Sequence, residues 1–270
     1  MNKEKQQESQ QLEHTRFRSL QELSFNEFST LCSDDNKRLD LRNNIMNGDV
    51  HVIRQVLAKE TSQMILKKII TLNIEISNDP KILEGIKNVY FESNNLKAKK
   101  TEYSSVDKSW YFFPWNKEEI GLSELIQPIF NNVILLNNQK INEILKKTPI
   151  DGFVQRFHLI NYPPNSGQIS LHQDPLNISQ VNSGIYFTEF GLDYKGGGFY
   201  VLNDKDEKVE LDKHFHIGDM VLFSPGLRHG VSAVEPMDSK IKSNGRYFLN
   251  MNLIQSHHAK DRIPALGIDL

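Results

Sequence analysis

The chain has 270 residues and a formal net charge of -2 at pH 7. This length can bury one sizeable core, and the charge offers no large basic surface for nucleic acid. Cys32 is the only cysteine, which excludes an intramolecular disulfide and suits a reducing compartment. No apolar stretch approaches the length of a membrane span, and the polar start lacks the apolar run of a signal peptide. We therefore expect one soluble, cytoplasmic domain over 1–270, without a nucleic-acid or membrane partner.

The first half of the chain is expected to support a core that comes later. Residues 1–14 are polar and rich in glutamine, which predicts disorder or a frayed helix. Residues 15–150 are expected to be mainly helical. Within them, 51–57 alternate like a strand, and 59–70 follow with the apolar spacing of a helix.

Two further helices are expected in this half. An Asn-Asp-Pro sequence at 78–80 supplies a cap and a first-turn proline for a helix over 80–90. The longest helix is predicted over 123–147, with a break at 137–140. Its apolar side is expected to pack against the outside of a sheet.

Five aromatic side chains crowd into 110–115, within the segment 103–115. Pro114 predicts a loop or a bent segment there. Such a cluster can fill part of the core, as large aromatic side chains commonly do. It can also form a wall or a lid of a substrate site, since loops often carry function. The sequence leaves both interpretations open.

The second half is a run of short strands separated by turns. The expected strands cover 168–174, 183–190, 197–202, 208–211, 218–224, 230–234 and 245–253. His214 and His216 are also expected to alternate within a strand. With no carboxylate at matching spacing, they are only a weak candidate for an adventitious metal site.

The most informative motif is His172-Gln173-Asp174. Side chains two residues apart on a strand point to the same face, so His172 and Asp174 can reach one metal ion together. His229, several strands further on, can complete a set of two imidazoles and one carboxylate. Such a set leaves three adjacent coordination positions open, as non-heme Fe(II) centres require. A bare His-x-Asp occurs by chance in many proteins, so the prediction depends on its context.

That context resembles one enzyme family. Residues 153–254 resemble the double-stranded β-helix core of the Fe(II)/2-oxoglutarate-dependent oxygenases, whose signature is His-x-Asp, several strands, a second histidine and then a basic residue. The residues that match it in order are His172, Asp174, His229 and Arg246. The glycine-rich segment 194–199 and the apolar segment 218–223 are also similar to the family's core. The resemblance implies an α+β fold, with a jelly-roll, cupin-like core and supporting N-terminal helices.

The resemblance also implies the cofactor and the co-substrates. His172, Asp174 and His229 would bind Fe(II), and Arg246 would anchor the C5 carboxylate of 2-oxoglutarate, with O2 as the second co-substrate. A guanidinium suits that task because it can hold a carboxylate through two parallel hydrogen bonds. No catalytic residue is expected beyond the metal site.

The strand before the motif departs from the DNA-dealkylating members of the family. Those enzymes have an asparagine and a tyrosine separated by one residue, both contacting 2-oxoglutarate. Here Asn161 and Tyr162 are adjacent and should point to opposite faces, so only one can serve, and we favour Tyr162. That subfamily's second arginine is replaced by Asn252. On the same strand, His158 can reach a substrate or simply form a hydrogen bond within the barrel.

The implied activity is hydroxylation of an aliphatic C–H bond, with conversion of 2-oxoglutarate to succinate. The expected substrate is a small molecule such as an amino acid, a carrier-free acid or an intermediate of natural-product biosynthesis. The alternatives are a protein side-chain hydroxylase of the prolyl type and a non-catalytic metal-binding barrel. The complete set of His172, Asp174, His229 and Arg246 weighs against the barrel without turnover.

Overall fold

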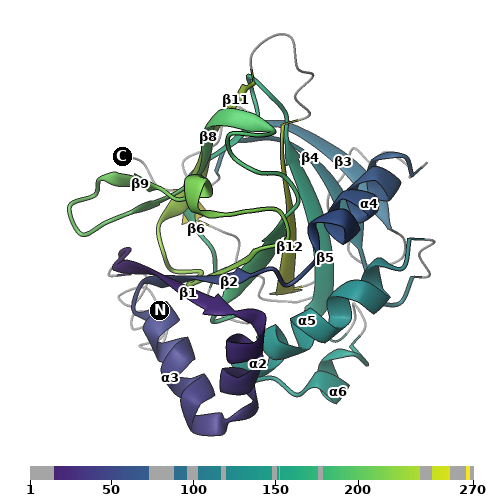
Figure 1. The fold of residues 1–270 in the computed structure, drawn as a ribbon, viewed down its shortest axis with the longest axis vertical. Coiled ribbons are helices and arrows are strands. Elements are labelled where there is room, and N and C mark those ends of the chain that lie inside the picture. The colour runs from purple at the N-terminus through teal and green to yellow at the C-terminus, as the bar shows by residue number, and fades with distance from the viewer. Residues whose placement is uncertain are drawn as a thin grey trace.

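The computed structural model describes residues 15–72, 88–95, 103–116, 120–147, 151, 153–175, 179–237, 245–255 and 266–267. The strands join into one sheet that curls around a central cavity, and the α-helices lie outside it (Figure 1). The strands are β1 (Ser19–Ser24), β2 (Asp49–Arg54), β3 (Val89–Asn95), β4 (Ser105–Phe112), β5 (Phe153–Tyr162), β6 (Gln168–Gln173), β7 (Asn182–Tyr186), β8 (Tyr194–Leu202), β9 (Lys208–Glu210), β10 (Met220–Phe223), β11 (His229–Pro236), β12 (Arg246–Gln255) and β13 (Leu266–Gly267). The helices are α2 (Phe25–Ser33), α3 (Asp35–Met46), α4 (Lys59–Ile70), α5 (Leu122–Leu136), α6 (Ile141–Ile144) and the short 3₁₀ helix η2 (Asp212–His214).

The sheet folds into two facing halves. Its hydrogen-bonded path is β1-β2-β10-β7-β12-β5-β4-β6-β11-β8-β9, with β3 on β4 and β13 on β6. β4 pairs with both β5 and β6, and so joins the half that holds β7 and β12 to the half that holds β11 and β8. Inward side chains from both halves line the same cavity. The strands predicted for the second half are found in order, with their ends shifted by a few residues.

The longest pairing in the sheet is that of β5 with β12. It runs over ten residues, from Arg246 opposite Tyr162 to Gln255 opposite Phe153. Alternate side chains of an extended strand point to opposite faces. One face of this ribbon therefore lines the cavity, while the other packs against the helices.

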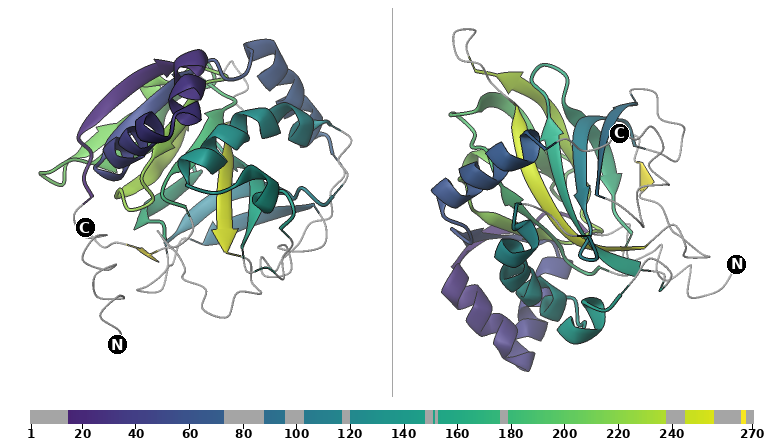
Figure 2. Two further views of the ribbon diagram at one scale, coloured as in Figure 1. Left: turned by 90° about the horizontal axis from the view of Figure 1, so that it is seen from below. Right: turned by 90° about the vertical axis from the view of Figure 1, so that its right-hand side faces the viewer.

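The helices cover the outer face of the half that contains β10, β7, β12 and β5 (Figure 2). α5 contributes most to this core because seven of its fifteen side chains are buried. At the start of α2, Ser24 and Glu27 form a capping box, which satisfies backbone N–H groups that the helix leaves free. None of the described helices is both long and apolar enough to span a membrane.

The expectations for the first half have mixed outcomes. The predicted strand corresponds to β2, the helix over 59–70 is α4, and the longest helix breaks at 137–140 as predicted. The side chain of Asn137 explains the break, since it accepts hydrogen bonds from the backbone of Gln180 and Val181 and so ties the helix end to the core. The helix over 80–90 lies mostly outside the described residues, as do 1–14, and its last two positions belong to β3. This half also supplies β1 to β4, so its support is not only helical.

The aromatic segment belongs to the core. The predicted loop or bend is wrong up to residue 112, because β4 continues to Phe112 and the chain turns only after Phe113. Trp110, Phe112 and Phe113 are buried, and the Trp110 ring lies 4.8 Å from that of Tyr90. None of residues 110–115 is among the described residues that line the cavity. The core interpretation therefore holds, and the wall or lid finds no support.

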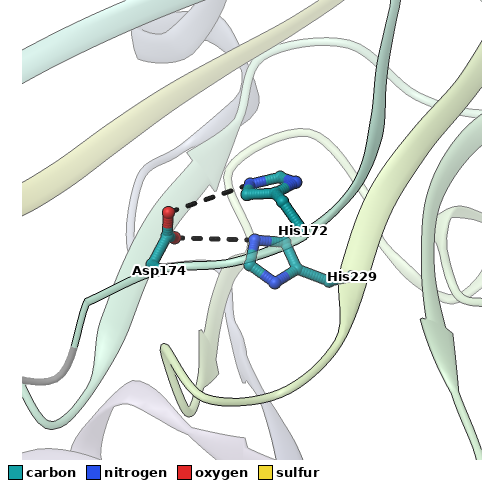
Figure 3. Close-up of side chains that lie close together, drawn as sticks. All are labelled: His172, Asp174 and His229. Atoms are coloured by element: carbon teal, nitrogen blue, oxygen red, sulfur yellow. Dashed lines mark ion pairs between the residues drawn. The ribbon is translucent and has the colours of Figure 1, made fainter. Parts of the chain in front are cut away.

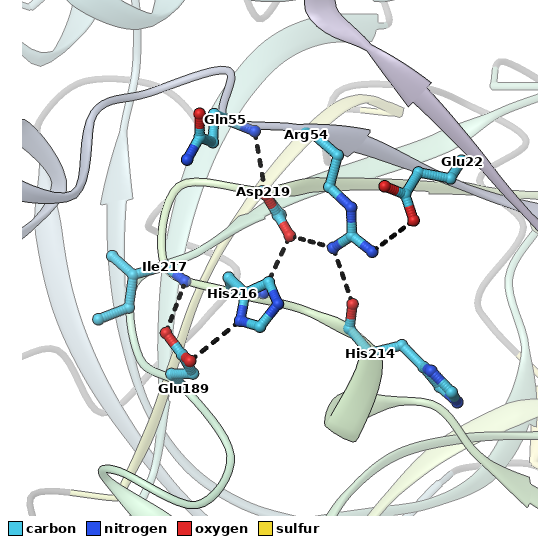
Figure 4. A network of polar contacts seen from close by, with 8 residues as sticks. All are labelled: Glu22, Arg54, Gln55, Glu189, His214, His216, Ile217 and Asp219. Carbon is cyan, nitrogen blue, oxygen red and sulfur yellow. Dashed lines mark hydrogen bonds and ion pairs between the residues drawn. The ribbon is translucent and has the colours of Figure 1, made fainter.

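A network of polar contacts fixes β1 and β2 to the turn that leads into β10 (Figure 4). Arg54 donates from Nη1 to Asp219 Oδ2 (2.6 Å) and from Nη2 to Glu22 Oε2 (2.7 Å). The Asp219 side chain is buried and also accepts from the backbone N–H groups of Gln55 and His216, both at 2.9 Å. Both of its oxygens are thus bonded to donors of this chain, which is the arrangement of a structural carboxylate.

His214 and His216 do not lie in a strand, so that prediction is wrong. His214 ends η2, and its carbonyl accepts from Arg54 Nη1 at 2.9 Å. Nδ1 of His216 lies 2.9 Å from Glu189 Oε1 (Figure 4). Neither histidine belongs to a group of described residues that could hold a metal ion.

Candidate metal centre and cavity

Two adjacent strands bring the three predicted metal ligands together. β6 and β11 are antiparallel neighbours, and His172 near the end of β6 lies opposite His229 at the start of β11. Asp174 follows β6 directly, and its carboxylate points toward both imidazoles (Figure 3). One potential ligand atom from each residue lies within 4.8 Å of the others. This is the only such group among the described residues.

The hydrogen bonds of the two histidines orient them for metal binding. Nδ1 of His172 lies 2.8 Å from the carbonyl oxygen of Ser170, and Nδ1 of His229 lies 2.7 Å from that of Leu227. A carbonyl only accepts, so each Nδ1 must carry the proton and each Nε2 keeps a lone pair. The Nε2 atoms of His172 and His229 face Asp174, at 3.8 Å from Oδ1 and 3.5 Å from Oδ2 (Figure 3).

The surroundings of His229 favour the neutral imidazole that a metal needs. Burial and the neighbouring His172 ring lower the pKa of His229 to about 4. Asn182 donates from Nδ2 to Asp174 Oδ2 at 2.7 Å, which holds the carboxylate in its orientation. The ring of Tyr103 lies 4.9 Å from that of His172 and covers its side.

The group opens into a cavity of about 250 Å³ between the two halves of the sheet. Its apolar middle is formed by side chains of both halves, among them Ile160, Phe248, Phe199 and Val231. Its ends are polar, with Arg246 and Tyr162 at one end of the β5–β12 ribbon and Arg156 and Asn252 further along it. Ligand sites commonly combine an apolar lining with a few polar groups in this way.

Arg246 lines this cavity, but one edge of its guanidinium is already bonded to a carboxylate. Nε donates to Asp212 Oδ2 (2.6 Å), and Nη2 donates to Asp212 Oδ1 (3.2 Å) and to the hydroxyl of Tyr186 (3.1 Å). The hydroxyls of Tyr186 and Tyr194 also donate to Asp212, at 2.8 and 2.7 Å. Arg246 and Asp212 are each only 2% exposed, so each neutralises a charge that would be costly to bury alone.

The glycine-rich segment makes room for this ion pair. Gly198 has φ +102°, and a Cβ atom there would lie 2.1 Å from Asp212 Oδ2. Any side chain at this position would push the carboxylate away from Arg246. Glycine at this position therefore leaves the space in which Asp212 pairs with Arg246.

Tyr162 and Asn161 point to opposite faces of β5, as expected for adjacent strand residues. Tyr162 lines the cavity, and its ring centre lies 5.5 Å from Cζ of Arg246. Burial raises the pKa of its phenol, which keeps the hydroxyl protonated and able to donate. Asn161 is buried but is not among the residues that line the cavity.

Sequence reasoning missed Asp212 and Asn182. A buried arginine needs a counter-charge, so an acidic partner for Arg246 was foreseeable, but no spacing rule identifies Asp212 as that partner. Asn182 follows the metal motif by eight residues, and only the folded chain shows that it reaches Asp174. Both act on the proposed site through another residue.

No protein-family profile matches the sequence, and no curated protein matches it either. Solved structures do resemble it. A prolyl-4-hydroxylase of Pseudomonas putida is 11% identical, with a TM-score of 0.50 over 80% of this chain and 97% of that one. A prolyl hydroxylase of Trichoplax adhaerens, solved with a peptide fragment of a hypoxia inducible factor, is 14% identical, with a TM-score of 0.50 over 83% and 93%. The predicted α+β fold with a double-stranded β-helix core is therefore confirmed.

Proposed function

We propose that this protein is an Fe(II)/2-oxoglutarate-dependent dioxygenase that hydroxylates an aliphatic C–H bond of a small molecule. The observation that carries the proposal is the group formed by His172, Asp174 and His229. It lies in the wall of a cavity that also contains the buried Arg246. Such a cavity offers a metal site for the keto-acid end of 2-oxoglutarate and a cation for its distal carboxylate.

The donor atoms fit Fe(II). Two imidazole Nε2 atoms and one carboxylate converge from β6 and β11, and the Nδ1 hydrogen bonds leave both Nε2 lone pairs available. Nitrogen and oxygen donors in a set of three suit non-heme Fe(II) because they leave positions for co-substrates. His172, Asp174 and His229 would hold the metal, and Asn182 would orient the carboxylate.

Arg246 and Tyr162 would hold the distal carboxylate of 2-oxoglutarate. Asp212 already occupies the Nε and Nη2 edge of the guanidinium, so the second edge is the one left for a ligand. The hydrogen bonds of the guanidinium to Asp212 and Tyr186 come from Nε and Nη2, and Tyr162 lines the cavity nearby. Arg246 and Tyr162 would each donate a hydrogen bond to this carboxylate. This arrangement would replace the two parallel hydrogen bonds from Arg246 that the sequence suggested.

When bound, Fe(II) with 2-oxoglutarate and O2 supplies the oxidising chemistry, with succinate and CO2 as products beside the alcohol. The chain's own contribution is to bind, to orient and to exclude water. Ile160, Phe248 and Val231 give the cavity an apolar middle next to the metal ligands. Asp212 and Tyr186 hold the Arg246 guanidinium in one place, and Tyr194 in turn holds the Asp212 carboxylate.

The size of the cavity supports a small substrate. At about 250 Å³ it is smaller than the roughly 300–1,000 Å³ of typical drug-sized ligand sites, although it must accept a keto acid as well. An amino acid, another small acid or a natural-product intermediate fits this limit. The second candidate is a hydroxylase of a protein side chain of the prolyl type, which the likeness of the fold to two prolyl hydroxylases favours.

Succinate formation from 2-oxoglutarate tests the proposal. Full-length protein with Fe(II), O2 and a small-acid or prolyl-peptide library should release succinate in step with a hydroxylated product, as followed by NMR and mass spectrometry. His229→Ala should release none, while His216→Asn, a histidine outside the cavity, should behave as the wild type. Succinate release that persists in His229→Ala would refute the assignment of the metal ligands. If the wild type binds metal but not 2-oxoglutarate, the chain is instead a non-catalytic barrel.

A further inference from the structure

A row of four residues runs across four neighbouring strands at one level of the barrel. Its members lie directly opposite one another in the strand pairing: Tyr111 of β4, His158 of β5, Asn250 of β12 and Gly184 of β7. We call these four residues the cross-strand row. Of the four, His158 and Asn250 line the cavity. They place two polar side chains side by side in its wall.

An apolar pair separates the row from the proposed co-substrate site. Ile160 and Phe248 lie opposite each other on β5 and β12, between the row and the pair of Tyr162 and Arg246. The Phe248 ring lies over Gly184, since a Cβ atom there would be 2.1 Å from its Cζ. Glycine in the row thus makes room for this apolar boundary. The polar groups of the row are therefore left for a second ligand, the substrate.

A hydrogen-bond relay fixes the state of His158. Ser109 of β4 donates from its hydroxyl to Asp107 Oδ1 at 2.7 Å, and the same Oγ lies 2.8 Å from His158 Nε2. Because the hydroxyl proton is committed to the carboxylate, Nε2 of His158 must be the donor to Ser109. Burial, with the charge of Arg156, holds the pKa of His158 well below its usual value. The ring is therefore neutral, and Nδ1 carries a lone pair.

That lone pair is open to the cavity. No described residue forms a hydrogen bond with Nδ1 of His158, and this atom is not among the described polar atoms that are buried without a partner. It is therefore reachable from the cavity that the residue lines. The ring is also held in orientation, since it stacks on Tyr111 with 4.2 Å between the ring centres. A fixed acceptor of this kind selects a ligand that donates a hydrogen bond.

Asn250 supplies the complementary group. Its neighbour Asn252 is tied to the chain, because its Oδ1 accepts from the backbone of Ser183 at 3.3 Å. By contrast, no described residue forms a hydrogen bond with the Asn250 side chain, whose amide is reachable from the cavity. Side chains directly opposite each other on antiparallel strands have Cβ atoms about 4.5–5.5 Å apart. One small group of a ligand can therefore contact both Asn250 and His158.

The two side chains together favour an uncharged group. A carboxylate only accepts hydrogen bonds, so its oxygens would face the lone pair of His158 Nδ1. An ammonium only donates, and the burial that keeps His158 uncharged also penalises a ligand charge at the same place. An amide is neutral and carries a donor and an acceptor on neighbouring atoms. Its N–H matches Nδ1, which leaves the NH2 group of Asn250 for its carbonyl.

We propose that the substrate carries an uncharged amide, as in a lactam or a small carboxamide, and that the cross-strand row binds it. The N–H donates to Nδ1 of His158, and the carbonyl accepts from Nδ2 of Asn250. Ser109 and Asp107 are positioning residues, which select the tautomer of His158 that accepts. The inference rests on the proposed function, because that function assigns the metal end of the cavity to chemistry.

Binding to a protein that cannot turn over tests this class directly. The full chain is loaded with Zn(II) in place of Fe(II) and with 2-oxoglutarate, and is screened by ligand-observed NMR against small lactams and primary carboxamides. Each lactam is compared with the lactone of the same ring size, which lacks only the N–H, and with the cycloalkanol. Each carboxamide is compared with its carboxylate. We expect at least one amide to bind, and its lactone or carboxylate counterpart to bind about tenfold more weakly.

Variants assign the contacts through the ratio of lactam to lactone affinity. His158→Gln places its amide near the position of Nε2, so the ratio should fall toward one. Asn250→Ala removes the donor to the carbonyl that both ligands share, so both should bind more weakly at an unchanged ratio. Ser109→Ala touches no ligand but frees the tautomer of His158, so the ratio should also fall. His216→Asn is the matched control outside the cavity and should change nothing.

The outcomes separate this inference from the proposed function. If the Zn(II) protein does not bind 2-oxoglutarate, the proposed function itself fails, and the inference with it. If it binds 2-oxoglutarate but no amide, or binds lactones or carboxylates as tightly as amides, the substrate class is wrong and the function stands. Cycloalkanols that bind as tightly as lactams would overturn the amide in favour of an alcohol. A wild-type ratio in His158→Gln would exclude Nδ1 as the acceptor.

Discussion

Two clusters of charged side chains in this molecule differ in what their polar atoms face. In the Arg54–Asp219 cluster, both carboxylate oxygens and the guanidinium are bonded to groups of the chain itself (Figure 4). In the cluster of His172, Asp174 and His229, both Nδ1 atoms are bonded to backbone carbonyls, and both Nε2 atoms face the Asp174 carboxylate at the cavity. The first cluster ties strands together, and the second has the arrangement of a ligand site. A charged cluster whose donors and acceptors are all bonded within the chain is therefore structural. A cluster whose polar atoms face a cavity is a candidate functional site.

Arg246 lies between these two types. One edge of its guanidinium is saturated by Asp212 like a structural arginine, and the other lies at the cavity with the proposed ligand role. The comparison predicts that its removal affects both stability and binding. It also predicts that changes in the Arg54–Asp219 cluster affect stability alone. Changes in the cluster of His172, Asp174 and His229 should affect binding alone.

The largest expected effect follows from removal of a metal ligand. His229→Ala and Asp174→Ala should each abolish measurable Fe(II) binding in anaerobic calorimetry, because two donors cannot hold the ion as three do. The folded state should survive, since the ligand atoms of both residues face the cavity rather than the helix-covered core. Circular dichroism should show a melting transition close to that of the wild type. Wild-type iron affinity in His229→Ala would contradict the comparison.

The second effect concerns Arg246 and should appear in two properties. Arg246→Ala leaves Asp212 buried without its counter-charge, which should lower the free energy of unfolding by about 3–5 kcal/mol. If the guanidinium also holds 2-oxoglutarate, affinity for it should fall roughly a hundredfold to a few thousandfold. Arg246→Lys keeps the charge near Asp212 and should lose less stability than Arg246→Ala. Denaturant unfolding and ligand titration on the same samples measure both properties.

The third effect lies in the saturated cluster. Asp219→Ala removes the acceptor for Arg54 and for the backbone N–H groups of Gln55 and His216. We expect it to lower the free energy of unfolding by about 2–4 kcal/mol. Fe(II) and 2-oxoglutarate affinities of the folded protein should remain those of the wild type. A large loss of metal affinity here would mean that the two clusters are coupled.

The smallest expected effect is that of Asn182→Ala. This change removes the amide that bonds to Asp174 while leaving all three proposed ligands in place. Loss of such a supporting hydrogen bond typically weakens metal affinity by about 10–100-fold. Asn182→Asp should weaken it at least as much, because a second carboxylate would repel Asp174. Unchanged affinity in both variants would show that Asp174 is oriented by other contacts.

The grouping of His172, Asp174 and His229 was predictable because its signal is periodic and local. His172 and Asp174 share one face of a strand by spacing alone, and the second histidine starts another strand in the expected order. The Arg246–Asp212 pair was not predictable. The chain has 34 acidic residues, and no sequence spacing indicates which of them meets Arg246 in the folded barrel.

The predictions that were wrong also have identifiable physical causes. Pro114 suggested a loop over the aromatic segment, but it follows the end of β4 and does not interrupt it. His214 and His216 alternate like strand residues, yet two alternating positions are compatible with a turn as well. By contrast, the helix break at 137–140 was visible because polar residues interrupt the apolar spacing there.

Anaerobic titration of the Fe(II)-loaded full chain with 2-oxoglutarate tests the central claim most directly. A keto acid that chelates the iron gives a visible metal-to-ligand charge-transfer band, whose growth reports affinity. We expect the band in the wild type and, at the same affinity, in Asp219→Ala. It should require a much higher concentration of 2-oxoglutarate in Arg246→Ala and be absent in His229→Ala. No band in a wild-type protein that holds Fe(II) would contradict the account, as would equal affinity in the wild type and Arg246→Ala.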